Sequence, residues 1–573
     1  MPKIWEIFPK IQSNFINKHP EYNRVVLQLL FNRNIIEKKE IKEFLNPDYH
    51  NLLDPFLFND MDKSVNLIIQ HIKKHNKIAV YGDYDADGVT ASAVLVKILT
   101  ILKADTEVYL PDRKTEGYGL NKKAIKELAQ KNIKLIITVD AGICNKTEVE
   151  YAKSLDIDVI ITDHHIPPKQ EKLPKCLTIN AHNKNEKYSF KFLAGVGVAF
   201  KLAKAIINKS TLTDEIKQKL ENSMLDLIAI GTIADCVSLL GENRILVKHG
   251  LKKLNKTKKT GLTELIKLIQ NNNKTLDTWN VGFQIAPRLN AAGRMDHANT
   301  AFELLITKNQ EEAAFLANRL NDKNIDRQKI TEQIVREIEK QADVQKDNKI
   351  IIGVCPFEEQ ESKTWNEGVI GLAAGRICDR YYKPTLIITK DENNNLKGSG
   401  RSIEEFDIRE ALEQCNDFLS NYGGHPGACG FSLLPENLEK FSLQIKKLAK
   451  KRLAKINLQP KLKIECELNI NEINEDLINQ INKCAPFGQN NPRPIFISKK
   501  VCISKIVNMG VNGNHIKFRI NGLWALAFGE AEKWKDLQIG NYVDVVYYAE
   551  MNEFNGTRES QIRVIDMRNA HNA

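Results

Sequence analysis

The chain of 573 residues lacks a long apolar segment: no run approaches the roughly 18 to 20 residues that a membrane span requires. Its first ten residues, MPKIWEIFPK, lack the apolar core of a signal peptide. The ten cysteines, spread from Cys144 to Cys502, contain no CxxC pair, which argues against a zinc ribbon or a redox motif. We therefore expect a cytoplasmic protein in which most cysteines are buried thiols.

Glycine and proline are absent from Gln310 to Val344, a segment rich in Glu, Ala, Gln, Lys and Arg. This composition predicts one long helix of about 50 Å, at 1.5 Å per residue, that connects two lobes. Neither an internal repeat nor a long low-complexity tract is found in the sequence.

Hydrophobic residues make up 42% and charged residues 27% of the sequence, as in soluble globular proteins, and the length predicts three or four domains. Lysine and arginine exceed aspartate and glutamate by 83 to 72, which gives a net charge of +11. This excess would suit a polyanionic partner. A solvated lysine-rich surface explains it too and is favoured on charge alone.

Short apolar runs alternate with helical patterns from Lys77 onward, which predicts βαβ units and a mostly parallel sheet. The expected strands are Ile78–Tyr81, Glu107–Leu110, Leu135–Val139 and Val159–Thr162. The expected helices are Val89–Leu102, Lys122–Gln130, Lys146–Leu155, Val196–Ile207 and Asp214–Ile230. A second α/β unit is expected from Ile350 to Arg452, with strands Ile350–Val354 and Thr385–Ile388 and helix Val369–Tyr381.

The last part of the chain is rich in β patterns. The expected strands are Lys463–Leu468, Val501–Val507, His515–Ile520, Trp524–Phe528, Tyr542–Tyr548 and Gln561–Met567. Their turns carry Gly510, Asn512-Gly513, Asn521-Gly522 and Asn555-Gly556. The pattern fits a small antiparallel barrel of OB type, a fold that commonly binds single-stranded nucleic acid, although any small β-barrel would give a similar pattern.

Three aspartates alternate in YGDYDADG, from Tyr81 to Gly88, between an apolar run and a helix. Alternate side chains of an extended segment share a face, so Asp83 and Asp85 can point at one spot. The alternative is an Asx-rich turn, and for Asp87 we expect the role of helix N-cap.

The next two predicted strands end at Asp140 and at Asp163-His164-His165. The carboxyl ends of parallel strands meet at one edge of a sheet, so these side chains are expected to converge. Asp235, in GTIADCVSL, could reach the same edge. Each motif alone is more typical of a polar loop than of a ligand set, but their order and positions together favour a shared site.

Clustered carboxylates repel one another unless a cation neutralises them. Carboxylates with some imidazole suit Mn²⁺ or Mg²⁺, whereas zinc more often takes cysteine or more histidine. Two such ions can generate hydroxide from water and stabilise the charge that develops on a phosphoryl group. The chemistry that fits is phosphoester hydrolysis.

Four motifs, YGDYDADG, TVDAG, TDHH and GTIAD, resemble those of the DHH phosphoesterase superfamily in sequence and in order. Further segments resemble motifs of its RecJ-type exonucleases: FLAGVGVAFKL, RLNAAGRM, GVIGLAAGRI, KGSGRSI, GGHPGACG and APFGQNNPRPIF. The resemblance extends from about residue 20 to residue 568.

The patterns and the resemblance together predict an α/β fold in five parts. Residues 1–70 are expected to form an N-terminal helical segment, 71–308 a parallel-sheet DHH catalytic domain, 309–345 the connecting helix, 346–455 a smaller α/β DHHA1 domain and 456–573 an OB-type nucleic-acid-binding domain.

The resemblance also implies roles for individual residues. The family's metal ligands match Asp83, Asp85, Asp140, His164 and Asp235, with Asp140 bridging two ions of Mn²⁺ or Mg²⁺. His165 matches a histidine close to the scissile phosphate, so the expected catalytic residues are His165, Asp83 and Asp140.

Substrate-binding positions of the family match Arg113, Arg294, Ser399 and Arg401, which would hold the terminal 5′ phosphate or the adjacent backbone. Arginine forks suit that task. His425 matches a residue that reaches the scissile region from the second lobe. Without the resemblance, a surface salt bridge would be the preferred role for each arginine, and a structural histidine is the alternative for His425.

Three positions depart from the family pattern. Ala79 stands four residues before Asp83, where phosphatase members carry a histidine ligand, so one metal is expected to have fewer protein ligands and to bind more weakly. Asn366 replaces a usual histidine, which puts one substrate contact in doubt, and Cys429 replaces a usual alanine, which fits core packing.

The function that the resemblance implies is a metal-dependent exonuclease that degrades single-stranded DNA processively from its 5′ end to nucleoside 5′-monophosphates, in recombination and repair. Its expected partners are a helicase and a single-strand-binding protein, and the family suggests a monomer. One alternative is a DHH-type phosphodiesterase on short oligonucleotides or cyclic dinucleotides, but those enzymes usually lack the third domain. Another is a non-catalytic DNA-binding replication scaffold, but such relatives lose metal ligands.

Overall fold

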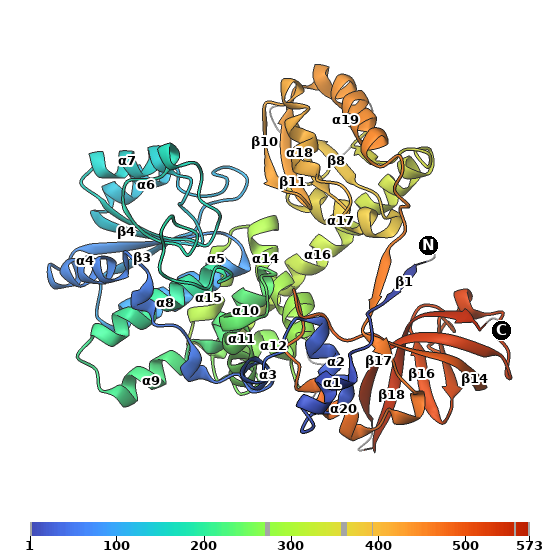
Figure 1. Ribbon diagram of the computed structural model, residues 1–573. Coiled ribbons are helices and arrows are strands. Elements are labelled where there is room, and N and C mark those ends of the chain that lie inside the picture. Colours follow the sequence, from blue (N-terminus) through green and yellow to red (C-terminus); the bar gives the residue numbers. More distant parts are fainter. Residues whose placement is uncertain (1–2, 270–274, 357–363, 392–393, 555–556, 571–573) are drawn as a thin grey trace.

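The structure is a computed structural model that describes residues 3–269, 275–356, 364–391, 394–554 and 557–570. Figure 1 shows two domains with central sheets, a long helix that leads from the first to the second, and a C-terminal barrel. None of the described helices is long and apolar enough to cross a membrane. The predicted turn at Asn555-Gly556 lies outside the described residues.

A parallel five-stranded sheet forms the centre of the first domain, in the order β3-β2-β4-β5-β6. Its strands are β2 (Lys77–Gly82), β3 (Thr106–Tyr109), β4 (Ile133–Val139), β5 (Asp158–Thr162) and β6 (Leu177–Ile179). The four predicted strands are confirmed. The three-residue β6 is too short to give a pattern in the sequence.

Helices cover both faces of this sheet, because alternate residues of a strand point to opposite sides. Ile78 and Val80 of β2 belong to the core that includes α4 (Met61–Lys73), α5 (Ala86–Ile101) and α8 (Gly195–Lys209). Ala79 and Tyr81 face α6 (Lys122–Gln130) and α7 (Lys146–Ser154). These helices lie on the faces of the sheet, so the carboxyl ends of the strands lead into the loops that carry the predicted site.

The helix predicted over Asp214–Ile230 is wrong: the segment forms α9 (Asp214–Asn222) and α10 (Leu225–Ala234). Helix α9 buries only Glu221, whereas residues 225–233 of α10 are all buried, so the chain turns at Ser223 to bring α10 into the core. Further helices of the domain are α11 (Gly241–Leu254), α12 (Thr260–Lys267), α13 (Thr278–Asn280), the π-helical turn η4 (Val281–Ile285), α14 (Ala286–Met295) and α15 (Asn299–Ile306).

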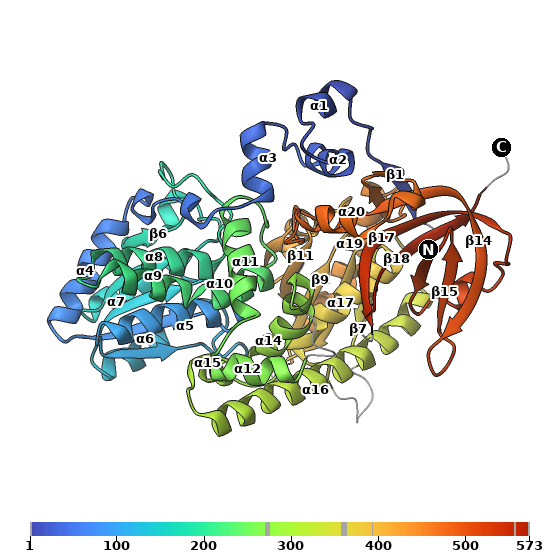
Figure 2. The same cartoon turned by 90° about the horizontal axis from the view of Figure 1, so that it is seen from below.

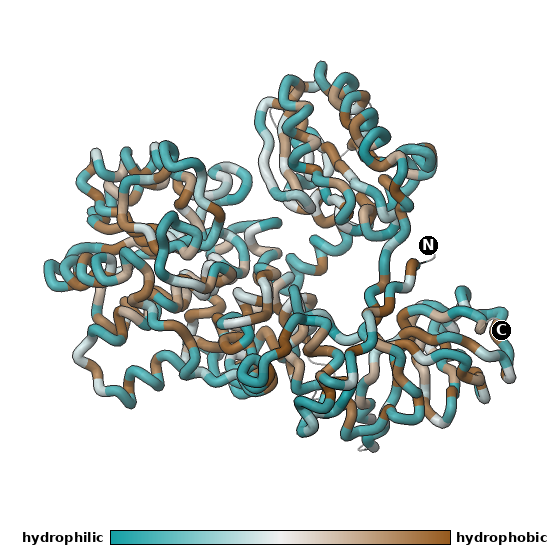
Figure 3. Tube along the Cα trace, viewed as in Figure 1, coloured by the Kyte–Doolittle hydropathy of each residue, from teal (hydrophilic) through white to brown (hydrophobic). Residues whose placement is uncertain are grey.

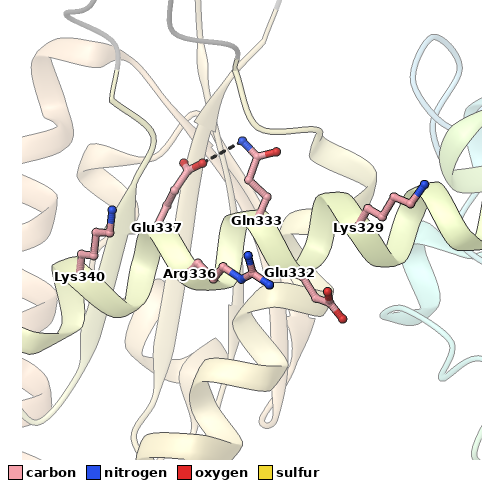
Figure 4. A pocket seen from close by; sticks show the side chains of 6 residues that line it. All are labelled: Lys329, Glu332, Gln333, Arg336, Glu337 and Lys340. Carbon is pink, nitrogen blue, oxygen red and sulfur yellow. Dashed lines mark hydrogen bonds between the residues drawn. The ribbon is translucent and has the colours of Figure 1, made fainter.

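The predicted long helix is confirmed as α16 (Gln310–Asp343), whose 34 residues extend about 51 Å. Figures 1 and 2 show it running from the first domain to the second. A shallow pocket on this helix is lined by charges of both signs and one amide (Figure 4): Lys329, Glu332, Gln333, Arg336, Glu337 and Lys340. Such mixed charge is typical of a solvated helix face.

The second domain contains a mixed five-stranded sheet in the order β10-β11-β9-β8-β7. Its strands are β7 (Ile351–Val354), β8 (Thr385–Lys390), β9 (Leu396–Arg401), β10 (Asn421–His425) and β11 (Ala428–Leu433). One face packs on α16 and α17 (Glu367–Tyr381), and the other on α18 (Ile408–Glu413) and α19 (Leu438–Arg452). The predicted second α/β unit is thus present.

The C-terminal domain is a closed barrel. Neighbouring strands pair in the sheet order β14-β15-β16-β18-β17, and β17 also pairs with β14, which closes the sheet. Its strands are β14 (Phe496–Met509), β15 (His515–Ile520), β16 (Leu523–Ala527), β17 (Tyr542–Phe554) and β18 (Thr557–Asn569). The turn at Asn521-Gly522 has positive φ at both residues, as a two-residue hairpin requires.

The single strand predicted over Lys463–Leu468 is wrong. The segment forms β12 (Lys461–Ile464), which pairs with the N-terminal β1 (Ile4–Ile7), and β13 (Cys466–Glu467), which extends the barrel sheet. Helix α20 (Glu475–Asn482), which the sequence analysis did not predict, follows.

The N-terminal helices pack on the barrel although the two are far apart in sequence. Helices α1 (Ser13–Lys18), α2 (Arg24–Asn32) and α3 (Lys38–Leu45) share or border a core with α20 and the barrel strands. Arg244 of α11 is buried where these parts meet the first domain, and it donates to the carbonyls of Phe44, Lys483 and Ala485. One side chain thus ties three segments together.

Hydrophobic residues concentrate along the strands and on the helix sides that face them (Figure 3). No disulfide joins the ten cysteines, all of which lie in the described residues; five are buried, three are half-buried, and Cys144 and Cys236 are exposed. The expectation that most are buried therefore holds for only half of them.

Candidate active site

The loop from β2 into α5 holds two of the predicted metal ligands. Asp85 is the N-cap of α5, and its Oδ1 accepts hydrogen bonds from the backbone N–H groups of Asp87 (2.9 Å) and Gly88 (3.1 Å). Asp83 is buried and lies so close to Gly88 that a Cβ there would come within 2.6 Å of the Asp83 backbone. Gly88 therefore allows Asp83 and Asp85 to share one loop.

Asp140 follows β4 and turns into the same space. It adopts φ 61°, an uncommon left-handed conformation for a residue other than glycine, and its N–H donates to the carbonyl of Thr162 (3.0 Å). A Cβ on Gly195, the first residue of α8, would lie 2.5 Å from the Asp140 Cβ. The absence of a side chain at Gly195 therefore makes room for the Asp140 carboxylate.

His164 and Asp235 complete the cluster. His164 Nε2 lies 3.1 Å from Asp140 Oδ1 and 3.6 Å from Asp235 Oδ2, while the histidine makes a hydrogen bond to the backbone of Leu193. Burial and the neighbouring His165 lower the pKa of His164 to about 4, so its imidazole is neutral at pH 7, the form that binds metals.

Three sets of three residues could each hold a metal ion, because the ligand atoms within each set lie within 4.8 Å of one another. Asp140 belongs to two of these sets. The sets are Asp83 with Asp85 and Asp140, Asp140 with His164 and His165, and Asp87 with His164 and Asp235. The structure thus brings together all five predicted ligands around Asp140.

Within the described part of the chain, four buried atoms of this cluster have no hydrogen-bond partner: Asp83 Oδ1, Asp140 Oδ1, His164 Nε2 and Asp235 Oδ2. Buried polar atoms are rarely left unsatisfied in native proteins. Carboxylate oxygens with one imidazole nitrogen are a donor set that suits Mn²⁺ or Mg²⁺. The residues present therefore fit a divalent cation site.

Electrostatics support the same interpretation. Burial and then repulsion from neighbouring aspartates raise the pKa of Asp235 to about 9. Burial likewise raises the pKa of Asp83 and of Asp140 well above the usual range of a carboxyl group, and nearby carboxylates add to the shift. A divalent cation would offset this repulsion and keep the carboxylates ionised.

His165 is held by the buried Asp163, which was expected at the same sheet edge but had no predicted role. Asp163 Oδ1 accepts from His165 Nδ1 (2.7 Å) and from the backbone N–H of His164, and Oδ2 accepts from Ile143 N–H. Burial alone would lower the pKa of His165, but the hydrogen bond and charge of Asp163 raise it. The Tyr118 hydroxyl also lies 3.0 Å from His165 Nδ1.

Asp87 is not the N-cap of its own helix, as predicted; Asp85 is. Instead, Asp87 accepts from the backbone N–H groups of Gly195 (2.6 Å) and Val196 (2.9 Å), so it caps α8 from a different part of the chain. Only the tertiary packing of α5 against α8 creates this contact, so no local pattern could have revealed it.

The three predicted phosphate-binding arginines converge from separate segments. Arg113 lies over the ring of Tyr84 at 4.9 Å, and Arg294 Nη1 donates to the carbonyl of Gly368 (2.8 Å). Burial lowers the pKa of Arg294 to about 9, and the positive charges of Arg113 and, to a lesser extent, Arg401 contribute to this shift. None of the three forms an ion pair with a described residue, which leaves their positive charge available for an anion.

Ser399 lies beside Arg401 on β9, with 3.5 Å between Ser399 Oγ and Arg401 Nη1. His425 is exposed at the end of β10. It pairs with Ala428 of β11, which pairs with Arg401, so His425 lies two strands from Arg401, about 10 Å at the usual spacing. His425 is in none of the metal-ligand sets found among the described residues.

The three departures from the family pattern have structural roles. Ala79 is fully buried in the apolar core between the sheet and α6 and α7. Asn366 caps α17, because its Oδ1 accepts from Gly368 N–H (2.8 Å). Cys429 is buried beside Gly400, and burial raises the pKa of its thiol to about 12.

Family models match three parts of the chain. The N-terminal domain of the DHH family matches residues 77–232, the DHHA1 domain matches residues 347–451, and the RecJ OB domain matches residues 464–566. These ranges coincide with the first sheet, the second sheet and the barrel.

The chain is 36% identical to the single-stranded-DNA-specific exonuclease RecJ of Bacillus subtilis, over 95% of this chain and 67% of that protein. It is 32% identical to the enzyme of the same name from Haemophilus influenzae, over 96% of each. Crystal structures of RecJ from Thermus thermophilus are similar, one in complex with Mn²⁺ (TM-score 0.83, 27% identity, 99% of this chain and 80% of that one) and one with Mg²⁺ (TM-score 0.76, 26% identity, 99% and 79%).

Proposed function

Because the chain belongs to the RecJ family of single-stranded-DNA-specific exonucleases, we propose that it degrades single-stranded DNA from the 5′ end to nucleoside 5′-monophosphates in recombination and repair. The observation that carries the catalytic part is the cluster of buried, unsatisfied ligand atoms at the ends of β2, β4, β5 and α10. The set is intact, which argues against a non-catalytic scaffold.

Asp83, Asp85, Asp140, His164 and Asp235 would hold two ions of Mn²⁺ or Mg²⁺, with Asp140 shared between them. When bound, such ions lower the pKa of water to give a hydroxide nucleophile and neutralise charge on the phosphoryl group. Asp163 engages Nδ1 of His165, which leaves Nε2 as the ring atom that can donate to a phosphate oxygen. His165 would thus stabilise charge on the scissile phosphate.

Recognition of the 5′ end is assigned to Arg113, Arg294, Ser399 and Arg401, and a backbone contact to His425. Guanidinium groups without carboxylate partners attract a phosphate strongly. A terminal phosphate carries more charge than an internal one, so this cluster favours a phosphorylated end. Exposed His425, about 10 Å from Arg401, would contact the strand rather than its terminal phosphate.

The closed barrel argues against a phosphodiesterase confined to dinucleotides, because such a small substrate would need no third domain. The barrel would hold the part of the strand that has not yet reached the active site. We propose a monomer, acting in the cytoplasm on strands that a helicase opens and a single-strand-binding protein coats.

The test uses single strands labelled at either end, with Mn²⁺, with Mg²⁺ and with a chelator, and compares the wild type with Asp140→Ala. Asp322→Ala, at an exposed position on α16 with no ion pair to a described residue, is the matched control. We expect metal-dependent release of mononucleotides from the 5′ end by the wild type and the control only. Digestion by Asp140→Ala at the wild-type rate, or attack from 3′ ends, would contradict the proposal.

The partner proposals have their own tests. A blunt duplex should resist the enzyme alone and become a substrate once a helicase is added. Sedimentation should give the mass of one chain, 65.2 kDa. Degradation of the blunt duplex without helicase, or a stable dimer, would contradict them.

A further inference from the structure

Two large aromatic side chains are exposed on the first domain, which carries the metal-ligand cluster. Trp279 is 54% exposed and Phe283 is 68% exposed, and their rings stack on each other with centroids 5.7 Å apart and planes 27° apart. Single exposed apolar residues are common on protein surfaces. Two stacked rings at adjacent turns of one helix form instead a continuous aromatic surface.

The helix that carries these rings leads into the active site. α13, the π-helical turn η4 and α14 continue one another from Thr278 to Met295. The same continuous helix provides Asn290, whose Oδ1 accepts from Ala86 N–H at 2.7 Å, and Arg294 of the arginine cluster. Arg294 is fifteen residues beyond Trp279, about four turns, so both lie on the same side of the helix.

Gly282, the residue before Phe283, adjoins the helix that ends at the predicted ligand Asp235. A Cβ on Gly282 would lie 3.7 Å from Ile233 of α10, and Asp235, two residues after Ile233, is the C-cap of that helix. From Phe283 to Arg294 the helix rises about 16 Å, the length of about five nucleotides at 3.4 Å each.

At its other end, this helix meets the segment that leads into the barrel. Thr278 Oγ1 donates to the carbonyl of Phe487 (2.6 Å), and Leu239 N–H donates to the carbonyl of Gln489 (2.9 Å). Residues 483–495 connect α20 to β14. The helix that carries the aromatic pair therefore runs from the arginine cluster to the segment that leads into the barrel.

We propose that Trp279 and Phe283 form a stacking platform for bases of the single-stranded DNA substrate, about five to seven nucleotides from the 5′ end. This inference rests on the proposed function. Bases stack on exposed aromatic rings regardless of sequence, which suits an enzyme that must advance along any strand. The platform would keep the incoming strand aligned between barrel and active site.

The platform predicts a dependence on substrate length. Phe283→Ala or Trp279→Ala should weaken binding of a 5′-phosphorylated strand of about 12 nucleotides by about 5- to 30-fold, the lower part of the range for loss of one stacked base. Binding is measured in the Asp140→Ala background to prevent hydrolysis. A trinucleotide cannot reach the rings, so kcat/KM for its hydrolysis by the variants with Asp140 intact should equal that of the wild type.

The controls separate stacking from other effects. Trp279→Phe keeps a ring and should retain most of the binding, and Phe315→Ala, which removes a ring that is 66% exposed on α16, should change neither measurement. A 2-aminopurine base about five to seven nucleotides from the 5′ end should be quenched by the wild type and not by the double alanine variant. The dependence of binding on salt should be unchanged, because no phosphate contact is lost.

Equal binding of the longer strand by wild type and alanine variants, or equal loss on the trinucleotide, would overturn the inference. The first result would assign the rings to another role, such as contact with a protein. If the wild type itself does not degrade single-stranded DNA, the proposed function fails instead.

Discussion

Replacing Gly195 by alanine should impair catalysis by displacing Asp140. The new Cβ would lie 2.5 to 2.6 Å from the Cβ, Cγ and Oδ1 of Asp140, whereas carbon atoms in contact prefer at least about 3.5 Å. The distance between residue 195 and the Asp140 side chain must therefore increase by about 1 Å. Helix α8 cannot easily retreat, because Asp87 holds the N–H groups of Gly195 and Val196.

Most of this displacement should fall on the Asp140 carboxylate. Shifts of about 1 Å in a catalytic group typically cost about 100-fold in rate, so we expect a loss of that size in kcat, together with weaker Mn²⁺ binding. The assay is release of mononucleotides from single-stranded DNA over a range of Mn²⁺ concentrations, with calorimetry for metal binding and circular dichroism for folding.

Gly197→Ala is the matched control in the same helix. A Cβ at Gly197 would lie 3.1 Å from Leu193 Cδ2 and 3.3 Å from Leu193 Cβ, so a shift of only a few tenths of an ångström would relieve the contact, and Asp140 is not among its neighbours. We expect near wild-type activity for this variant. Wild-type kcat and Mn²⁺ dependence for Gly195→Ala would refute the reasoning, as would equal losses in both variants.

Three further predictions follow from other parts of the structure. Arg244→Met should destabilise the protein by about 3 kcal/mol or more, because buried carbonyls of Phe44, Lys483 and Ala485 lose a charged donor; unchanged thermal unfolding would contradict this. Arg401→Ala should reduce the preference for 5′-phosphorylated over 5′-hydroxyl ends more than it reduces kcat, with exposed Arg409→Ala as control, and an unaltered preference would count against the assignment. In the presence of a chelator, stability should fall as pH rises from about 4 toward 9, because the folded pKa of Asp235, about 9, lies above its unfolded value and the folded state holds the extra proton. The slope from this group is at most about 1.4 kcal/mol per pH unit; Mn²⁺ should abolish the loss, and a flat pH profile of the unfolding temperature would contradict the prediction.

The parts of the fold that the sequence predicted are those with a strong local period. The strands that end at Gly82, Val139 and Thr162 and the long helix α16 carry uninterrupted apolar or helix-favouring patterns, and they appear within a few residues of their expected bounds. The separation of α9 from α10 at Ser223, and that of β12 from β13 within Lys463–Leu468, depend instead on the distant segments that each of these elements contacts. No window of sequence contains that information.

The same distinction applies to the site. Acidic residues at successive strand ends could be predicted to converge because parallel strands share an edge. The roles of Asp87 and Asp163 could not, because each depends on a partner whose position tertiary structure determines: α8 for the first and the His165 ring for the second. The only signal in the sequence for Asp163 was its position in the TDHH motif, directly after an apolar strand.

The two lobes meet directly at the site, and this contact has a consequence for the product. Arg294 Nη1 of the first lobe donates to the carbonyl of Gly368 at the start of α17, and a Cβ on Gly368 would lie 2.7 Å from the Arg294 carbonyl. Arg401 lies on the sheet that α17 covers. The packing of α14 against α17, rather than the length of α16, therefore fixes the distance from the metal-ligand cluster to Arg401. If Arg401 holds the terminal phosphate as proposed, that fixed distance determines how many nucleotides lie between the 5′ end and the scissile bond, which explains physically why a product of constant size is expected.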